Sequence, residues 1–380
     1  MQHKKREGLR TWIEIDRKAI EKNYRVFRGL ISPQTKLMAV VKSNAYGHSL
    51  ADFSREAEKL GADFLGVDSA VEALALRREG IKIPILVLGY TLPEMLQKAV
   101  LADVSFAISS MNQLKSLAGK EFGEKKPKIH LKVDTGMHRQ GFLPEEGKEV
   151  LKSLAILKNK IILEGIFTHF ASAKNPAFPA YTCHQIEDFK EWVSLLEKEG
   201  FHPIAHALAT SGAILFPEAH FDMVRIGIGL YGHWPSKETK SYAENKIKLS
   251  PAMSWKTIIS EIKKLPKGEK IGYDLTEELW RDSVVGICPV GYWHGFPRIL
   301  SGIGHFLAKG KRAKILGRVS MDMIVVDLTD VKGIKEGEEA VILGKSGEEE
   351  ITADEIGALA DSCSYEIITR TNPLIKRIFT

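Results

Sequence analysis

The chain has 380 residues, 44% hydrophobic and 27% charged, so it is long enough for two domains and its composition is that of a globular protein. Its 54 basic and 48 acidic residues leave a net charge of +6, too small and too evenly spread to predict a nucleic-acid partner. Three cysteines without ligand spacing predict neither a disulfide framework nor a metal site. Since no apolar run approaches the roughly 20 residues that span a bilayer, we expect a cytoplasmic protein without a membrane segment.

Short β-rich runs alternate with amphipathic helical patterns over the first two thirds of the chain. The runs are residues 36–42, 62–67, 84–88, 104–108, 129–133, 161–169, 204–208 and 223–226. Helix starts are legible between them, such as the capping box formed by Ser69 and Glu72. Eight strands, each followed by enough chain for a crossover helix, predict an α/β fold of the (β/α)8 TIM-barrel type. A doubly wound open sheet is the alternative.

The pattern changes after about residue 240. Strand-like runs at residues 253–262, 283–289, 313–319, 323–328 and 340–343 are divided by turns, and one helical pattern begins after Thr352. We therefore predict a barrel over residues 10–240 and a mainly β C-terminal domain over residues 241–380. Residues 1–9 are a candidate addition to the second domain.

A barrel concentrates its chemistry at the C-terminal ends of its strands. The polar residues expected there are Lys42, Asp134, His169, Ser211 and Arg225. A lysine at the mouth of a barrel either reaches into solvent or, when desolvated, has a lowered pKa and acts as a Schiff-base nucleophile. The residue pattern alone leaves both interpretations of Lys42 open.

The segment AVVKSNAYGH (residues 39–48) resembles the pyridoxal-phosphate attachment segment of alanine racemases. Further motifs of this family follow in order: KVDTGMHRQGF (132–142), THFASA (168–173), ATSGA (209–213), VRIGIGLYG (224–232), PAMSWK (251–256), IGYD (271–274), VGYWHGFPR (290–298), GRVSMD (317–322) and SYEIITR (364–370). The resemblance covers both predicted domains. It implies a barrel joined to a β domain, pyridoxal 5'-phosphate as cofactor, and a homodimer with shared active sites.

The resemblance also implies roles for individual residues. Lys42 binds the cofactor covalently and is one catalytic base, while Tyr273 of the partner subunit is the second base on the opposite face of the substrate. Arg225 faces the pyridine nitrogen, and because arginine only donates hydrogen bonds, that nitrogen stays unprotonated. Free tyrosine and lysine have pKa values near ~10 and ~10.4, so both bases need a lowered pKa, and His169 and Arg225 are the candidate groups that lower the pKa of Tyr273.

Other matched residues hold the cofactor and the substrate. The further cofactor-binding residues are Tyr46, Arg139, His169, Ser211, Gly227, Ile228 and Tyr365. Arg139 also reaches the substrate carboxylate, and Met321 completes the substrate site. Lys132 corresponds to a lysine that is often carbamylated in this family, which replaces its positive charge by a negative one.

We therefore predict an isomerase that interconverts L- and D-alanine and supplies D-alanine for peptidoglycan. A racemase of broader specificity, for serine, lysine or similar amino acids, is the first alternative. Its support is that Lys174 and Trp293-His294 depart from the common pattern near the expected access corridor. A basic-amino-acid decarboxylase and a non-catalytic pyridoxal-phosphate-binding protein are further alternatives.

Overall fold

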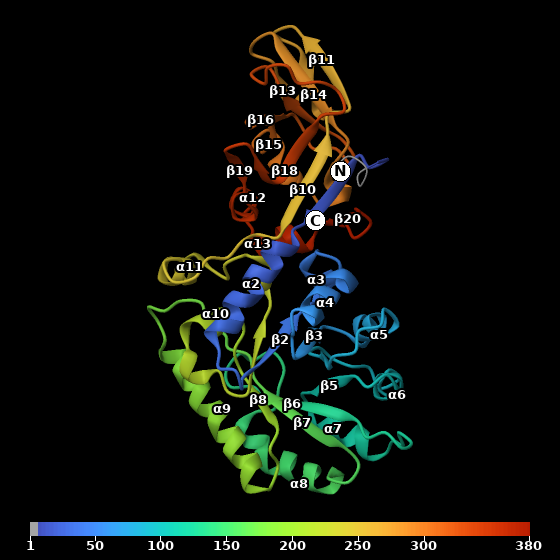
Figure 1. The fold of residues 1–380 in the computed structure, drawn as a ribbon, viewed down its shortest axis with the longest axis vertical. Coiled ribbons are helices and arrows are strands. Elements are labelled where there is room, and N and C mark those ends of the chain that lie inside the picture. Colours follow the sequence, from blue (N-terminus) through green and yellow to red (C-terminus); the bar gives the residue numbers. More distant parts are fainter. Residues whose placement is uncertain (1–6) are drawn as a thin grey trace. The chain divides into compact units, whose positions relative to one another are not determined.

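A computed structural model describes residues 7–380 of the chain, which form two compact units (Figure 1). The barrel unit consists of Lys18–Ala45 and Leu50–Ser250. The C-terminal unit combines residues 7–17 with Tyr46–Ser49 and Pro251–Thr380. Of residues 1–9, whose packing on the second domain was a hypothesis, residues 1–6 lie outside the described part.

Eight parallel strands form the sheet of the barrel unit, in the order β8-β7-β6-β5-β4-β3-β2-β9. They are β2 (Lys36–Val40), β3 (Phe64–Val67), β4 (Ile85–Val87), β5 (Ser105–Ile108), β6 (Lys128–Lys132), β7 (Ile162–Phe167), β8 (Ile204–His206) and β9 (Met223–Ile226). Asp222 N donates to Ala205 O (3.0 Å) and Arg225 N donates to Leu208 O (2.9 Å). These bonds bring β9 beside β8 and nearly close the ring. The predicted α/β barrel is confirmed, and each of its strands falls within or overlaps a predicted run.

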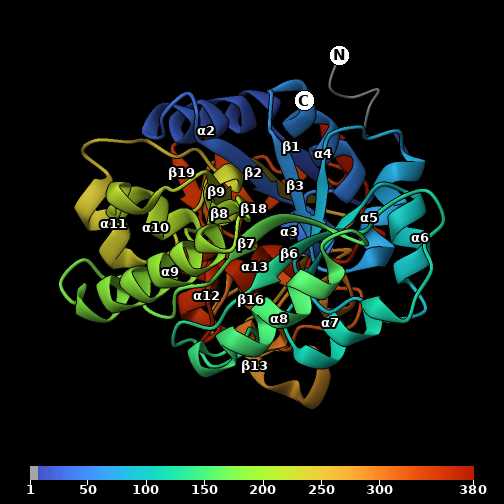
Figure 2. The same ribbon diagram turned by 90° about the horizontal axis from the view of Figure 1, so that it is seen from below.

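Helices connect the strands and surround them, as the view from below shows (Figure 2). They are α2 (Arg17–Leu30), α4 (Leu50–Lys59), α5 (Ala70–Arg78), α6 (Leu96–Leu101), α7 (Met111–Ala118), α8 (Gly147–Leu157), α9 (Ala180–Lys198), α10 (Thr210–Leu215) and α11 (Lys237–Ala243). Helix α5 begins as predicted, because the Ser69 hydroxyl accepts the Glu72 N–H. Within residues 7–380, no helix is both long enough and apolar enough to cross a membrane.

The C-terminal unit is mainly β, as predicted. Its large sheet follows the order β11-β14-β17-β16-β15-β18-β10-β1-β20, with β19 paired to β18. The strands are β1 (Thr11–Ile15), β10 (Met253–Ile258), β11 (Glu261–Leu265), β14 (Ser283–Cys288), β15 (His305–Ala308), β16 (Lys311–Leu316), β17 (Ile324–Asp327), β18 (Glu339–Ser346), β19 (Glu349–Ile351) and β20 (Arg377–Phe379). A small hairpin, β12 (Lys270–Ile271) and β13 (Glu277–Glu278), flanks a 3-10 turn, and two helices follow β19: α12 (Ala353–Leu359) and α13 (Ser364–Thr369).

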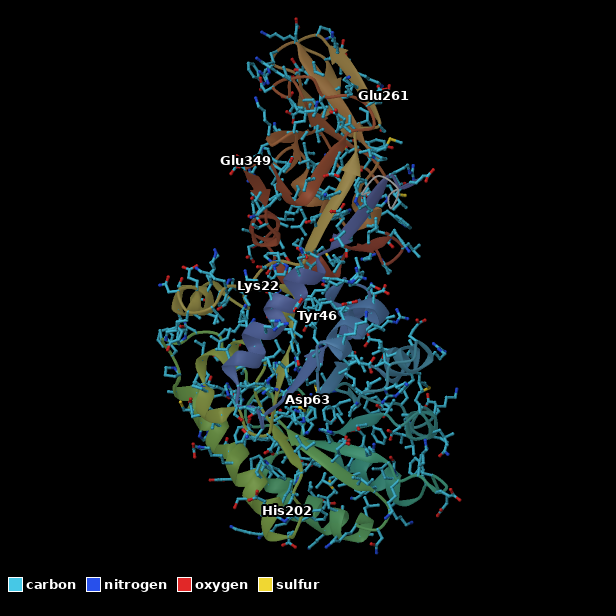
Figure 3. All side chains as sticks on the ribbon, viewed as in Figure 1. Lys22, Tyr46, Asp63, His202, Glu261 and Glu349 are labelled. Atoms are coloured by element: carbon cyan, nitrogen blue, oxygen red, sulfur yellow. The ribbon has the colours of Figure 1, made fainter. Side chains whose placement is uncertain are left out.

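The units divide at other residues than predicted. Strand β1 was assigned to the barrel, but it pairs antiparallel with β10 and parallel with β20, so it belongs to the C-terminal unit. The barrel unit also extends to Ser250 instead of ending at residue 240. Asn23 of α2 donates to Ser250 O (2.8 Å) and accepts from Ser250 N (2.8 Å), and Lys22 Nζ donates to Ser250 Oγ (2.9 Å; Lys22 is labelled in Figure 3). Both corrections arise from pairings over more than 200 residues, which local patterns do not reveal.

Candidate active site

Lys42 follows strand β2 and begins an unusual turn, α3 (Lys42–Tyr46). The four residues after it all have left-handed backbone angles, with φ of 56° at Ser43 and Asn44 and 51° at Ala45 and Tyr46. Each non-glycine residue in this region costs about 1–2 kcal/mol, so such a run persists only where the surrounding structure enforces it. Strain of this kind is concentrated at functional sites.

The ends of β2 and β3 are joined by Glu72. Its carboxylate accepts the backbone N–H of Ser43 (2.7 Å) and of Asp68 (2.8 Å). The Lys42 ammonium lies 3.8 Å from Asp68 Oδ1, and 40% of the Lys42 side chain is exposed. The amine is therefore held at the rim of the barrel and remains accessible to a ligand.

The loop after β6 is shaped by Asp134. Its carboxylate accepts the backbone N–H groups of four consecutive residues, Gly136 to Arg139, at 2.9–3.1 Å. Burial opposes ionisation of Asp134, but these four donors outweigh it and hold the pKa of the carboxyl below its usual range. The resulting tight turn leaves Arg139 exposed at the C-terminal end of the barrel.

Lys132 ends β6 and is buried at 6% exposure. Its ammonium donates to Gln140 Oε1 (3.0 Å) and lies 5.5 Å from the centroid of the Phe167 ring. Burial, together with the charges of Arg139 and Arg225, lowers the pKa of Lys132 to about 8. An amine with this pKa is partly unprotonated near neutral pH.

Arg225, on β9, is buried at 4% exposure and bound almost entirely by the barrel. Its Nη1 donates to His206 Nδ1 (3.0 Å) and His206 O (2.8 Å), and its Nη2 donates to Thr168 O (2.7 Å) and Ala207 O (2.8 Å). Burial lowers the pKa of Arg225 to about 9, so the group is still a cation at neutral pH. Within the described chain these bonds use only the two terminal nitrogens, which leaves the Nε–H for a ligand.

His169, after β7, lies beside this arginine, with 3.4 Å between its Nδ1 and Arg225 Nη2. Since arginine can only donate, the lone pair of His169 is on Nδ1 and its proton on Nε2. Burial and the neighbouring cations, Arg225 foremost, lower the pKa of His169 to about 3. His169 is therefore a neutral imidazole at physiological pH.

The loops after the last two barrel strands offer backbone donors and small side chains. Ser211 is the second residue of α10 and follows Thr210, whose hydroxyl accepts the N–H of Gly227 (3.2 Å). Gly227 and the buried Ile228 open a 3-10 turn after β9. In barrels of this type, the loops after the seventh and eighth strands most often bind phosphate.

The three tyrosines predicted for the site belong to the C-terminal unit and lie in two separate places. Tyr46, labelled in Figure 3, lies near Tyr365, with 6.3 Å between the ring centroids. Burial raises the pKa of Tyr46 to about 12 and, with the neighbouring Tyr46 phenol, also raises the pKa of Tyr365. Both phenols therefore stay protonated and can donate hydrogen bonds. Tyr273 stands apart, at the start of a 3-10 turn (Tyr273–Leu275) between β12 and β13, and is 69% exposed.

The Tyr273 turn is stabilised by an ion pair between Asp274 Oδ2 and Arg318 Nε (2.8 Å). Met321 follows the same loop region as Arg318 and is 52% exposed. Trp293 is also exposed, whereas His294 is buried and its Nδ1 accepts the Gly291 N–H (3.2 Å). His294 therefore has a structural role. Of the two residues that depart from the family pattern here, only Trp293 has an exposed side chain.

The structure thus gathers Lys42, Lys132, Arg139, His169 and Arg225 at one end of the barrel, and it pairs Tyr46 with Tyr365 in the C-terminal unit. Sequence reasoning missed Gln140, the partner of Lys132, and His206, the partner of Arg225. His206 could have been noticed as a polar residue within a buried strand. Gln140 has no such signal, because its role depends on the turn that Asp134 creates.

Family models match both parts of the chain. The alanine racemase N-terminal domain matches residues 15–235, and the alanine racemase C-terminal domain matches residues 252–379. Curated relatives include the alanine racemase of Leptospira interrogans, 40% identical over 97% of this chain and 95% of its own length. Alanine racemase 2 of Bacillus subtilis is 38% identical over 97% of this chain and 94% of its own length.

Solved structures agree. The alanine racemase of Bacillus anthracis with bound L-Ala-P has a TM-score of 0.92 and 34% identity, covering 98% of this chain and 95% of that one. The alanine racemase of E. faecalis has a TM-score of 0.89 and 30% identity, covering 98% of each chain. With family models and relatives spanning nearly its whole length, the chain belongs to the alanine racemase family, whose members depend on pyridoxal 5'-phosphate.

Proposed function

We propose that this chain interconverts L- and D-alanine with pyridoxal 5'-phosphate bound at the C-terminal end of the barrel, and so supplies D-alanine for peptidoglycan. The observation that carries the proposal is the arrangement of an accessible lysine amine, a buried arginine whose two terminal nitrogens are bonded by the barrel, and a neutral histidine at this end of the barrel. A cytoplasmic location and a homodimer are part of the same proposal.

The residues present fit the cofactor. Lys42 offers the amine for its aldehyde, and the backbone of Gly227 and Ile228 with the Ser211 hydroxyl offers donors for its phosphate. The family resemblance adds the hydroxyls of Tyr46 and Tyr365 as further phosphate donors. The free Nε–H of Arg225 suits the pyridine nitrogen, which must then be the acceptor and stay unprotonated. When bound, the cofactor withdraws electrons from the substrate and makes the Cα–H proton removable.

Racemisation requires that a proton leaves one face of Cα and another arrives on the opposite face. A single base on one side cannot do both efficiently, so two bases suit the reaction. Lys42 is the base on the barrel side, and we assign the other to Tyr273 of the partner subunit. The large exposure of Tyr273 and its firmly held turn support this assignment, because the side chain is presented to a second molecule. By the family resemblance, Arg139 binds the substrate carboxylate and Met321 completes the substrate site.

Lys132 is expected to carry a carbamate. Relative to free lysine, its pKa of about 8 raises the fraction of unprotonated amine at pH 7 by roughly a few hundred-fold, and only that form reacts with CO2. Because folding lowers the pKa of Lys132, the cation lowers the free energy of unfolding at neutral pH. This destabilisation begins to disappear as the pH rises through 8, so loss of the cation stabilises the folded protein. The anion formed would attract Arg139 and accept from the amide of Gln140.

Carbon-13 NMR in labelled bicarbonate checks the carbamate. We expect a carbamate resonance in the wild type and none in Lys132→Arg, whose guanidinium does not form one. Lys98→Arg, an exchange at an exposed helix position, is the control and should keep the signal. An identical resonance in Lys132→Arg would show that the carbamate does not form on Lys132.

Chiral chromatography of the products tests the proposed function. Starting from either enantiomer of alanine, the purified protein with cofactor should reach equal amounts of both, since enantiomers have equal free energies. Serine and lysine are assayed in parallel. Racemisation of one of these with alanine unchanged would favour the broader-specificity alternative, and release of CO2 would favour a decarboxylase.

A further inference from the structure

A chain of polar side chains crosses the interior of the barrel beneath Arg225. From Arg225 Nη1 it passes to His206 Nδ1 (3.0 Å), from His206 Nε2 to His130 Nδ1 (2.8 Å), and from His130 Nε2 to Glu164 Oε2 (3.1 Å). The Ser105 hydroxyl donates to the same Glu164 oxygen. Glu164 and Ser105 lie early in β7 and β5, so the chain runs toward the N-terminal ends of the strands.

The direction of every bond in this chain is fixed by Arg225. Arginine has no acceptor, so the Nδ1 of His206 must be unprotonated and its proton lies on Nε2. His206 then donates to His130, whose Nδ1 must also be unprotonated, and the remaining proton of His130 is donated to Glu164. A proton added to either ring would set two N–H groups against each other. Both histidines are therefore neutral.

Charges at the two ends of the chain balance each other. Both histidines are fully buried, and burial is the largest cause that lowers their pKa values, followed for His206 by the charge of Arg225. Burial opposes ionisation of Glu164, yet its bonds from His130 and Ser105 and the charge of Lys128 keep the pKa of Glu164 below its usual range. A cation and an anion thus face each other across two neutral rings.

The surrounding residues hold the two rings in place. The His206 ring stacks on Phe167, with 5.0 Å between centroids and planes 6° apart. The Arg225 guanidinium also lies over the Phe167 ring, 5.4 Å from its centroid. Gly165 leaves room for the His130 ring, since a Cβ at this glycine would overlap the His130 Nδ1. The arrangement therefore depends on a small residue at position 165.

We propose that Glu164 is the counter-charge of Arg225 and that it fixes the orientation of the arginine through the hydrogen bonds of His130 and His206. Glu164 is then a positioning residue for the arginine at the cofactor ring. The proposal rests on the proposed function for its catalytic consequence only. The chain of bonds itself is a property of the folded barrel.

Nitrogen-15 NMR of histidine-labelled protein with bound cofactor tests the direction of the bonds. His206 and His130, assigned by His206→Gln and His130→Gln, should both show a protonated Nε2 and a bare Nδ1, unchanged between pH 6 and pH 8, where Arg225 is a cation. A proton on Nδ1 of either ring, or a charged ring in this range, overturns the proposal. This measurement does not depend on activity. The NMR result can therefore contradict the proposed bond directions in a protein that racemises alanine, and it can support them in a protein that does not.

Two variants test the link to Arg225. Glu164→Gln keeps the shape but removes the charge, and Gly165→Ala displaces His130 without removing a polar group. Each should lower kcat about tenfold, with a smaller change in KM and a shifted absorbance maximum of the bound cofactor. The tenfold scale is that of losing a hydrogen-bond partner that orients a metal-ligating histidine. Glu149→Gln, which breaks an exposed pair with Lys115, is the control. Absorbance and kcat equal to this control in both variants would contradict the proposal.

Discussion

Replacing Lys42 by alanine should abolish racemisation and leave the cofactor loosely bound. The substitution removes the covalent attachment and one of the two bases together, so we expect kcat to fall by roughly 10³-fold or more. The visible absorbance of the bound cofactor should disappear after dialysis, and borohydride should fix no cofactor to the variant. The left-handed turn after Lys42 is enforced by bonds such as Glu72 to Ser43 N, so the fold should persist.

The matched control is Lys98→Ala, at an exposed position on α6. It removes a lysine of the same chemistry and should keep both the absorbance and the activity. If Lys42→Ala retained a borohydride-fixed cofactor, another lysine would be the attachment residue. Buried Lys132 would be the first to examine, because burial lowers its pKa to about 8.

Tyr273→Phe should reduce kcat by about 10²–10⁴-fold, the usual contribution of a positioned acid or base. Only a hydroxyl is removed, and the side chain is 69% exposed, so the free energy of unfolding and the cofactor absorbance should not change. Steady-state kinetics in both directions measure the effect. Tyr242→Phe, at another exposed tyrosine, is the control, and wild-type racemisation by Tyr273→Phe would remove Tyr273 from the mechanism.

Mixing the two inactive variants tests whether the sites are shared. In a mixed dimer of Lys42→Ala and Tyr273→Phe chains, one site combines an intact Lys42 with the intact Tyr273 of the partner subunit. Random reassociation should thus restore about a quarter of wild-type activity, since half of the dimers are mixed and each has one complete site. No restoration would mean that both bases come from the same chain or that the chains do not exchange.

The strands of the barrel were predictable because parallel strands buried on both faces are continuous apolar runs, such as that ending at Val40. Strand β1 could not be placed from the sequence, since its pairing with β10 joins residues more than 200 positions apart. Strand β15 (His305–Ala308) was not predicted either.

The site residues came from motifs, and the structure adds the physical causes that motifs do not contain. The neutral state of His169 depends on burial and on Arg225, which is 56 residues away along the chain. Likewise, the pairing of His206 with His130 brings together residues 76 positions apart. No spacing rule indicates such contacts, because they depend on which barrel strands are neighbours and which side chains point inward.

The central claim is that two bases act on opposite faces of the substrate, and exchange of the Cα proton in D2O tests it most directly. The wild type should incorporate deuterium from either alanine enantiomer. In Tyr273→Phe, Lys42 alone remains, so we predict that only one enantiomer exchanges its proton and that it does so without inversion. Exchange of both enantiomers at similar rates in Tyr273→Phe would contradict the account.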